Sequence, residues 1–223
     1  MTLNAELVEN FHAIFRQRQS GSLIVTGKDT VRFLFQDGEV MAMDLGQDKE
    51  LLLVDKLREY HRLDQTQHAL VLATRERVQG AVSDIVSQLQ LASDEEIGQT
   101  TRAMVEDNLC GVFGGAVTKL RFDPGQQVAS YNFDRTAVRL RIAVEVLLKT
   151  VETRVNEIEE VSKAVGSNES TYAFAEGAEN AGALSDFEKH VLNFVDGHST
   201  IDDMARACRD SSANLSRILY ALT

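Results

Sequence analysis

The sequence of 223 residues contains one proline, two cysteines and no tryptophan. A chain with so few helix-breaking prolines is expected to be mainly helical. The two cysteines, Cys110 and Cys208, lie far apart and form no CxxC pair, so we expect buried, reduced thiols. No apolar run reaches the length of about 18 residues that a membrane-spanning helix needs. The first residues also lack the basic and apolar segments of a secretory signal. These absences predict a soluble, cytoplasmic protein with no membrane contact.

The charge of the chain is strongly one-sided. It has 34 acidic and 23 basic side chains, a formal net charge of −11 and an isoelectric point near 4.9. An acidic surface keeps a protein soluble and weakens its attraction to phosphate backbones and anionic membranes. We therefore expect no broad nucleic-acid-binding surface.

Three short runs rich in β-branched and aromatic residues lie between Gly21 and Gly46. They cover Leu23–Thr26, Val31–Gln36 and Glu39–Asp44, and Asp37-Gly38 separates the last two. An Asp-Gly pair between two such runs favours a type I′ turn, in which both central residues have positive φ. The segment predicts an antiparallel meander in which Gly21, Asp37 and Gly38 shape the backbone.

A helix before the meander and a long helical insertion after it complete the first half of the chain. Apolar residues at spacings of three and four predict a helix over 3–19 with Asn4 as its cap. Residues 49–115 are helical almost throughout and contain two similar halves. Asp55, Leu57, Tyr60, Leu63 and Asp64-Gln-Thr-Gln recur 29 residues later as Asp84, Val86, Leu89, Ala92 and Ser93-Asp-Glu-Glu. Each half predicts a helix, a polar cap and a second helix, and two such hairpins can stack on each other.

Residues 116–122 alternate between apolar and polar side chains and end at the turn Asp123-Pro124-Gly125. They predict a fourth strand that pairs with the meander. The predicted fold is therefore α+β, a small antiparallel sheet carrying a long helical insertion. This domain is expected to cover residues 1–166.

The longest predicted helix covers residues 136–165 and ends at Gly166, a residue type that favours helix ends. Five of its apolar residues follow a near-heptad spacing: Val144, Leu148, Val151, Val155 and Ile158. Packing on its own domain is the favoured interpretation of this stripe. The alternative is a partly exposed seam that forms a homodimer.

A polar, glycine- and alanine-rich linker is expected over 167–182, interrupted by Thr171-Tyr-Ala-Phe, which we expect to dock as a short extended segment. Residues 183–223 then predict three short helices, with Ser185 and Glu188 forming a capping box at the first. This arrangement is typical of the helical part of a winged helix, although the chain stops at Thr223, where a wing would begin.

No catalytic or metal-binding pattern is visible. The five histidines (His12, His61, His68, His190 and His198) lack metal-ligand spacing. The glycines of Gly111-Val-Phe-Gly-Gly are followed by Ala-Val-Thr and not by Lys-Ser/Thr, so they form no P-loop and indicate a helix end that leads into a strand. We expect no catalytic residue, no cofactor and no metal.

Four arginines are candidate contacts for an anion or an acidic partner: Arg121, Arg135, Arg139 and Arg141. The last three would open the long helix, where cations oppose the helix dipole and need a compensating charge. The favoured interpretation is local ion pairing, for example of Arg139 with Asp134 or Glu145.

A winged-helix-like end also suggests DNA binding, with Asn214, Ser216 and Arg217 as the reading side chains. Residues 167–223 carry nine acidic and four basic side chains, a net charge of −5. Because cations supply most non-specific affinity for DNA, this charge favours a protein partner.

The order of elements resembles the PATAN family of bacterial domains of unknown function. The family's glycine motifs are matched by Gly21-Ser-Leu23 and by Phe35-Gln-Asp-Gly38-Glu-Val-Met-Ala42. Later elements are similar at Leu147-Leu148, at Asn156-Glu157 and at Asp196-Gly197-His-Ser-Thr200-Ile201-Asp-Asp203. The resemblance implies a non-catalytic interaction module of two-component and motility-related proteins.

We therefore expect a bacterial signalling scaffold that binds another protein, and we expect no enzyme. Two alternatives stay open. One is a transcriptional regulator that binds DNA through the C-terminal helices. The other is a sensor of an anion or cyclic dinucleotide, because the helical repeats distantly resemble N-terminal modules of secretion and pilus ATPases, some of which bind cyclic di-GMP.

Overall fold

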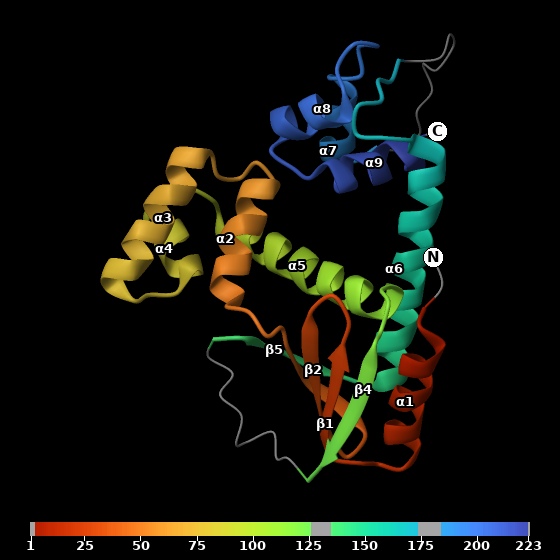
Figure 1. Ribbon diagram of the computed structural model, residues 1–223. Coiled ribbons are helices and arrows are strands. Elements are labelled where there is room, and N and C mark those ends of the chain that lie inside the picture. Colours follow the sequence, from red (N-terminus) through yellow and green to blue (C-terminus); the bar gives the residue numbers. More distant parts are fainter. Residues whose placement is uncertain (1–2, 126–134, 174–183, 223) are drawn as a thin grey trace. The chain divides into compact units, whose positions relative to one another are not determined.

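The computed structural model describes residues 3–125, 135–173 and 184–222. Its sheet is antiparallel, with the strand order β4-β1-β2-β3-β5, and Figure 1 labels β1, β2, β4 and β5. The strands are β1 Gly21–Thr26, β2 Thr30–Gln36, β3 Glu39–Asp44, β4 Lys119–Pro124 and β5 Ala137–Ile142. The helices are α1 Ala5–Arg16, α2 Lys49–Glu59, α3 Gln65–Val78, α4 Val82–Gln88, α5 Asp94–Gly114, α6 Val144–Val165, α7 Asp186–Leu192, α8 Ile201–Cys208 and α9 Ser212–Ala221. The predicted α+β class, with a helical insertion between β3 and β4, is confirmed.

Residue contacts divide the chain into two compact units. The first comprises Met1–Leu53 and Thr101–Glu157, and the second comprises Val54–Thr100 and Ile158–Thr223. This division differs from the boundary expected after residue 166, because the second unit combines part of the helical insertion with the C-terminal helices. Among the described residues, no helix is both long and apolar enough to cross a lipid bilayer.

The first unit is built around one apolar face of the sheet. Phe11 of α1 packs edge-on against Phe33, Phe35 and Phe113, with ring centroids 5.0–5.1 Å apart. Residues 144–155 of α6 and the last turns of α5 join the same core. Asn4 caps α1 as predicted, because its Oδ1 accepts the backbone N–H of Leu7 at 2.9 Å. Edge-to-face aromatic contacts of this kind add to the burial energy of the core.

The turn between β2 and β3 has the geometry that its Asp-Gly pair predicts. Asp37 and Gly38 both have positive φ, of 53° and 86°. A side chain at Gly38 would also lie 2.9 Å from the carbonyl oxygen of Phe15. At Gly21 the requirement is space, because a Cβ there would lie 2.4 Å from the carbonyl oxygen of Asp123. These three residues shape the meander and its contact with β4.

The helix predicted over 136–165 is wrong in its first eight residues. Residues 137–142 form β5, which pairs with β3, and α6 begins only at Val144. In β5 the apolar side chains of Val138, Leu140 and Ile142 contact the core, while Arg139 and Arg141 are exposed. This is the alternation of a strand, and arginine, leucine and alanine concealed it because they also favour helices.

The 29-residue repeat is visible in the backbone of the second unit. His61 and Gln90, which are 29 positions apart, have positive φ values of 53° and 54°. The residue after each donates its N–H to an equivalent carbonyl, Arg62 to Leu57 at 2.9 Å and Leu91 to Val86 at 3.0 Å. The next helix begins with a capping box in both halves, Asp64 with Gln67 and Ser93 with Glu96. The two halves are therefore copies of one helix–turn–helix design.

Polar contacts join the two repeats to each other and to α8. A guanidinium N–H of Arg62 donates to Oε1 of Glu96 at 2.9 Å. Arg209, which follows α8, donates to the carbonyl oxygens of Arg62 at 2.8 Å and Leu91 at 3.4 Å. These carbonyls occupy equivalent positions in the two turns, so one guanidinium binds both copies of the motif.

The three predicted C-terminal helices are present as α7, α8 and α9. Capping boxes begin α7 at Ser185 and α8 at Thr200. The carboxylate of Asp196 accepts the backbone N–H groups of Ser199 and His198, and these bonds lower its pKa to about 2. The expected extended segment is confirmed at Thr171, which forms a bridge with Thr200. Its residue Phe174 and most of the predicted linker lie outside the described residues.

Candidate functional site

The four candidate arginines do not form one site. Arg121 lies on β4 and Arg139 and Arg141 lie on β5, at opposite edges of the sheet. Four inter-strand spacings separate these edges, about 19 Å in total, so one small anion cannot contact both. Arg121 instead pairs with Asp123 on its own strand at 2.9 Å. The structure thus contradicts a joint anion site made by all four arginines.

Three of these arginines do gather along one edge. Arg135 lies two residues before the start of β5, and its Nε donates to Oδ2 of Asp48 at 3.0 Å. The Arg135 side chain remains 78% exposed, whereas that of Asp48 is 7% exposed. Asp134, the expected partner of Arg139, lies outside the described residues. We call Arg135, Arg139 and Arg141 the β5 arginines.

The β5 arginines follow an irregular strand. The register between β3 and β5 shifts between Val40 and Ala42, and Arg141 has a positive φ of 50°. Such a bulge redirects a side chain at a sheet edge. Among the described strands, β5 pairs only with β3, so its other edge has no strand partner there, although Nζ of Lys49 donates to the carbonyl oxygen of Ala137 at 3.3 Å.

The predicted apolar stripe of the long helix is mostly buried. Val144, Leu148, Val151 and Val155 are 0–6% exposed and belong to the core of the first unit. Only Ile158 is exposed, at 41%. Packing within the chain is therefore what the structure shows for this stripe. A partly exposed seam would depend on Ile158 alone among these five residues, and a dimer through this helix has no support.

The suggested DNA-reading residues lie on α9. The side-chain amide of Asn214 donates to Oδ2 of Asp210 at 2.7 Å, and its backbone N–H is bonded to Ser211. A base-edge contact by Asn214 would have to replace the bond to Asp210. Ser216 and Arg217 follow on the same helix.

Both thiols are free and buried, as predicted. Burial raises the pKa of Cys110 and of Cys208, which disfavours the reactive thiolate. Within the described part of the chain, no three histidine, cysteine or carboxylate side chains gather where they would hold a metal ion.

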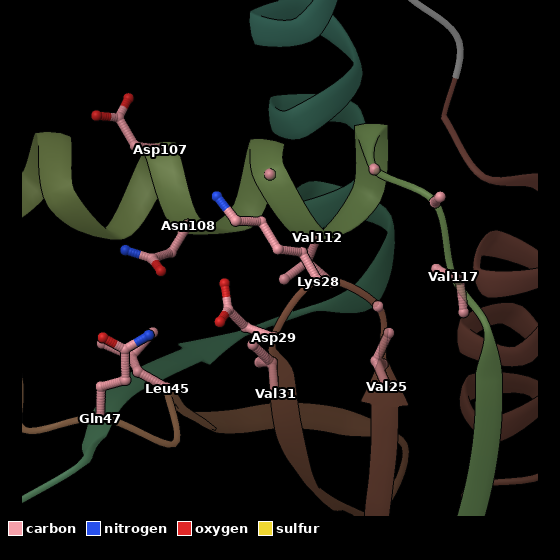
Figure 2. A pocket seen from close by; sticks show the side chains of 14 residues that line it. Val25, Lys28, Asp29, Val31, Leu45, Gln47, Asp107, Asn108, Val112 and Val117 are labelled. Carbon is pink, nitrogen blue, oxygen red and sulfur yellow. The ribbon is translucent and has the colours of Figure 1, made fainter.

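A cavity of about 390 Å³ in the first unit was not predicted. It lies between the β1–β2 turn and α5, as Figure 2 shows. Its apolar floor consists of Val25, Val31 and Leu45, and Val112 of α5 and Val117 complete the apolar lining. Lys28, Asp29, Gln47 and Asn108 supply polar groups. In Figure 2, Lys28 and Asp29 extend toward α5, whereas Asp107 points away from the sheet.

Gly111 is one of the residues that line this cavity. A Cβ at Gly111 of α5 would meet nothing within 4 Å, so the helix lacks a side chain where there is room for one. Glycine within a helix costs about 1 kcal/mol relative to alanine. The spacing of Gly111 in α5 and Gly115 just after it was the available sequence signal, although the partner turn at Gly27 lies more than 80 residues earlier.

Comparisons of the chain with protein-family models, with curated proteins and with solved structures gave no match.

Proposed function

We propose that this chain is a non-catalytic bacterial signalling scaffold of the PATAN type, which binds the acidic surface of a protein partner in the cytoplasm. The β5 arginines are the observation that supports this proposal. Three exposed cations lie within residues 135–141, a segment without an acidic side chain, in a chain of net charge −11. An exposed strand edge adds main-chain hydrogen bonds to a partner strand, while the arginines supply charge complementarity.

The test uses the two edges of the same sheet. Arg139→Glu/Arg141→Glu reverses the pair on β5, and Lys119→Glu/Arg121→Glu reverses the matching Lys-Leu-Arg pair on β4. A partner captured from bacterial lysate by the wild-type protein is purified, and its affinity for each variant is measured. We expect the β5 reversal to weaken binding at least about tenfold and the β4 reversal to change it little.

Two results would contradict this function. One is equal loss of affinity from both reversals. The other is the absence of any protein partner together with sequence-specific binding of duplex DNA at physiological salt, which would favour the transcriptional regulator.

A further inference from the structure

The cavity beside α5 has the size and walls of a ligand site. Its volume of about 390 Å³ falls in the range of about 300–1,000 Å³ that is typical of small-molecule pockets. Val25, Val31 and Leu45 of its floor are only 3–4% exposed. Pockets of this kind combine such an apolar floor with a few polar groups that orient the ligand.

The polar groups carry both signs of charge. Lys28 and Asp29 are neighbours on the β1–β2 turn, and Figure 2 shows both side chains directed toward α5. Neither side chain has an ion-pair or hydrogen-bond partner among the residues that the structure describes. The backbone holds the turn in place, because the N–H of Gly27 donates to the carbonyl oxygen of Asp29 at 2.9 Å. A cation and an anion thus stand side by side at the cavity, and neither forms an ion pair within the described residues.

Asn108 supplies an amide from the opposite wall. Its Nδ2 donates to the carbonyl oxygen of Met104 at 2.7 Å, which fixes the side chain on α5. The amide oxygen keeps its capacity to accept a hydrogen bond. The cavity therefore offers one anion-binding ammonium group, one carboxylate and one carbonyl-type acceptor above an aliphatic floor.

We propose that this cavity binds a small zwitterion with an aliphatic side chain, of the chemical class of the α-amino acids. Lys28 pairs with the ligand carboxylate, Asp29 and Asn108 accept from the ligand ammonium, and the side chain lies on the valine and leucine floor. A ligand that carries only one charge leaves Lys28 or Asp29 without an ion-pair partner, so we expect it to bind with lower affinity. This site is separate from the β5 arginines and extends the scaffold to ligand sensing.

Calorimetric titration of the full chain tests the charge requirement. The probes are L-leucine, L-isoleucine and L-valine, together with two analogues of leucine. Isopentylamine lacks the carboxylate, and 4-methylpentanoate lacks the ammonium group. We expect at least one of the amino acids to bind, with an affinity at least about tenfold higher than that of either analogue. Isopentylamine cannot pair with Lys28, and 4-methylpentanoate cannot pair with Asp29. Absence of binding by all three amino acids, or equal binding by an analogue, overturns the proposal.

Substitutions on α5 test the location. Gly111→Leu places a side chain in the cavity, and Gly98→Leu is a matched control, since a Cβ at Gly98 of the same helix also meets nothing within 4 Å. We expect Gly111→Leu to abolish binding and Gly98→Leu to preserve it. Lys28→Met, an exposed change that leaves the fold intact, should weaken binding about tenfold or more. Circular dichroism checks each fold, and unchanged binding by folded Gly111→Leu or by Lys28→Met overturns the site.

Discussion

The two helical hairpins of the second unit share a backbone design but differ in their side-chain chemistry. Both turns place a residue with positive φ after the first helix and a capping box before the second. The first box uses Gln67, whereas the second uses Glu96, a group that titrates. His68 of the first hairpin, bonded to Asp55 at 2.8 Å, corresponds to the apolar Ile97 of the second. Both turns therefore satisfy the same backbone hydrogen-bonding groups, but they use different side chains to do so.

Core truncation in the two hairpins should produce the largest effects. Leu57 and Val86 are equivalent and fully buried. Leu57→Ala should lower the free energy of unfolding by about 2–5 kcal/mol, since it removes three carbons and leaves a cavity. Val86→Ala should cost about 2 kcal/mol, because it removes two methyl groups. Urea unfolding followed by circular dichroism measures both values.

Leu89→Ala is the control for this pair, since Leu89 is 38% exposed in the second hairpin. Its effect should stay within about 0.5 kcal/mol. If Val86→Ala lowered the free energy of unfolding more than Leu57→Ala, the two hairpins would not contribute equally to the stability of the second unit.

Local signals in the sequence predicted much of this fold. The Asp37-Gly38 turn and the capping boxes depend on residues within a few positions of one another, so the short-range pattern contains them. The repeat relates residues 29 positions apart, but it is visible as a similarity between two stretches of sequence. The pairing of β3 with β5 depends on residues about 100 positions apart, and Arg-Leu-Arg satisfies helix and strand equally well. For that reason residues 136–143 were expected in a helix.

The candidate sites depended still more on distant contacts. The separation of Arg121 from Arg139 follows from the strand order, which no spacing along the chain reveals. The cavity is made by Lys28 and Asp29 with residues of α5, and only the fold brings these segments together. The apolar stripe from Val144 to Val155 was visible, but its burial in the core depends on the partners that cover it.

Removal of Arg209 should reveal how far the two turns depend on their shared donor. Arg209→Met keeps a long side chain and the positive φ of 53°, but it removes the bonds to the carbonyls of Arg62 and Leu91. We expect a loss of about 1–2 kcal/mol in the free energy of unfolding, measured by urea titration. Arg206→Met should cost at most about 0.5 kcal/mol, because Arg206 pairs only within its own helix at the surface. Equal costs for the two variants would show that Arg209 stabilises nothing beyond a surface ion pair.

The smallest of the predicted effects is a difference between the two capping boxes in how their contribution to stability changes on acidification. Burial raises the pKa of Glu96, but bonds from Ser93 and the charges of Arg62 and Arg209 outweigh burial and hold it below its usual value. A carboxylate with a lowered pKa in the folded state stabilises the protein above its unfolded pKa of about 4.3, and this contribution is lost as the pH falls through the folded pKa. Gln67 does not titrate, so this position of the first capping box contributes no such dependence.

Urea midpoints at neutral and acidic pH measure this difference. Glu96→Gln should be less stable than the wild-type protein at pH 7, and the gap should narrow as the pH falls below about 4. The reciprocal change Gln67→Glu should add acid sensitivity to the first hairpin, since Asp64 there provides the same cap geometry. A gap that stays constant with pH would mean that Glu96 acts only through packing, and the difference between the two hairpins would then be one of shape and not of charge.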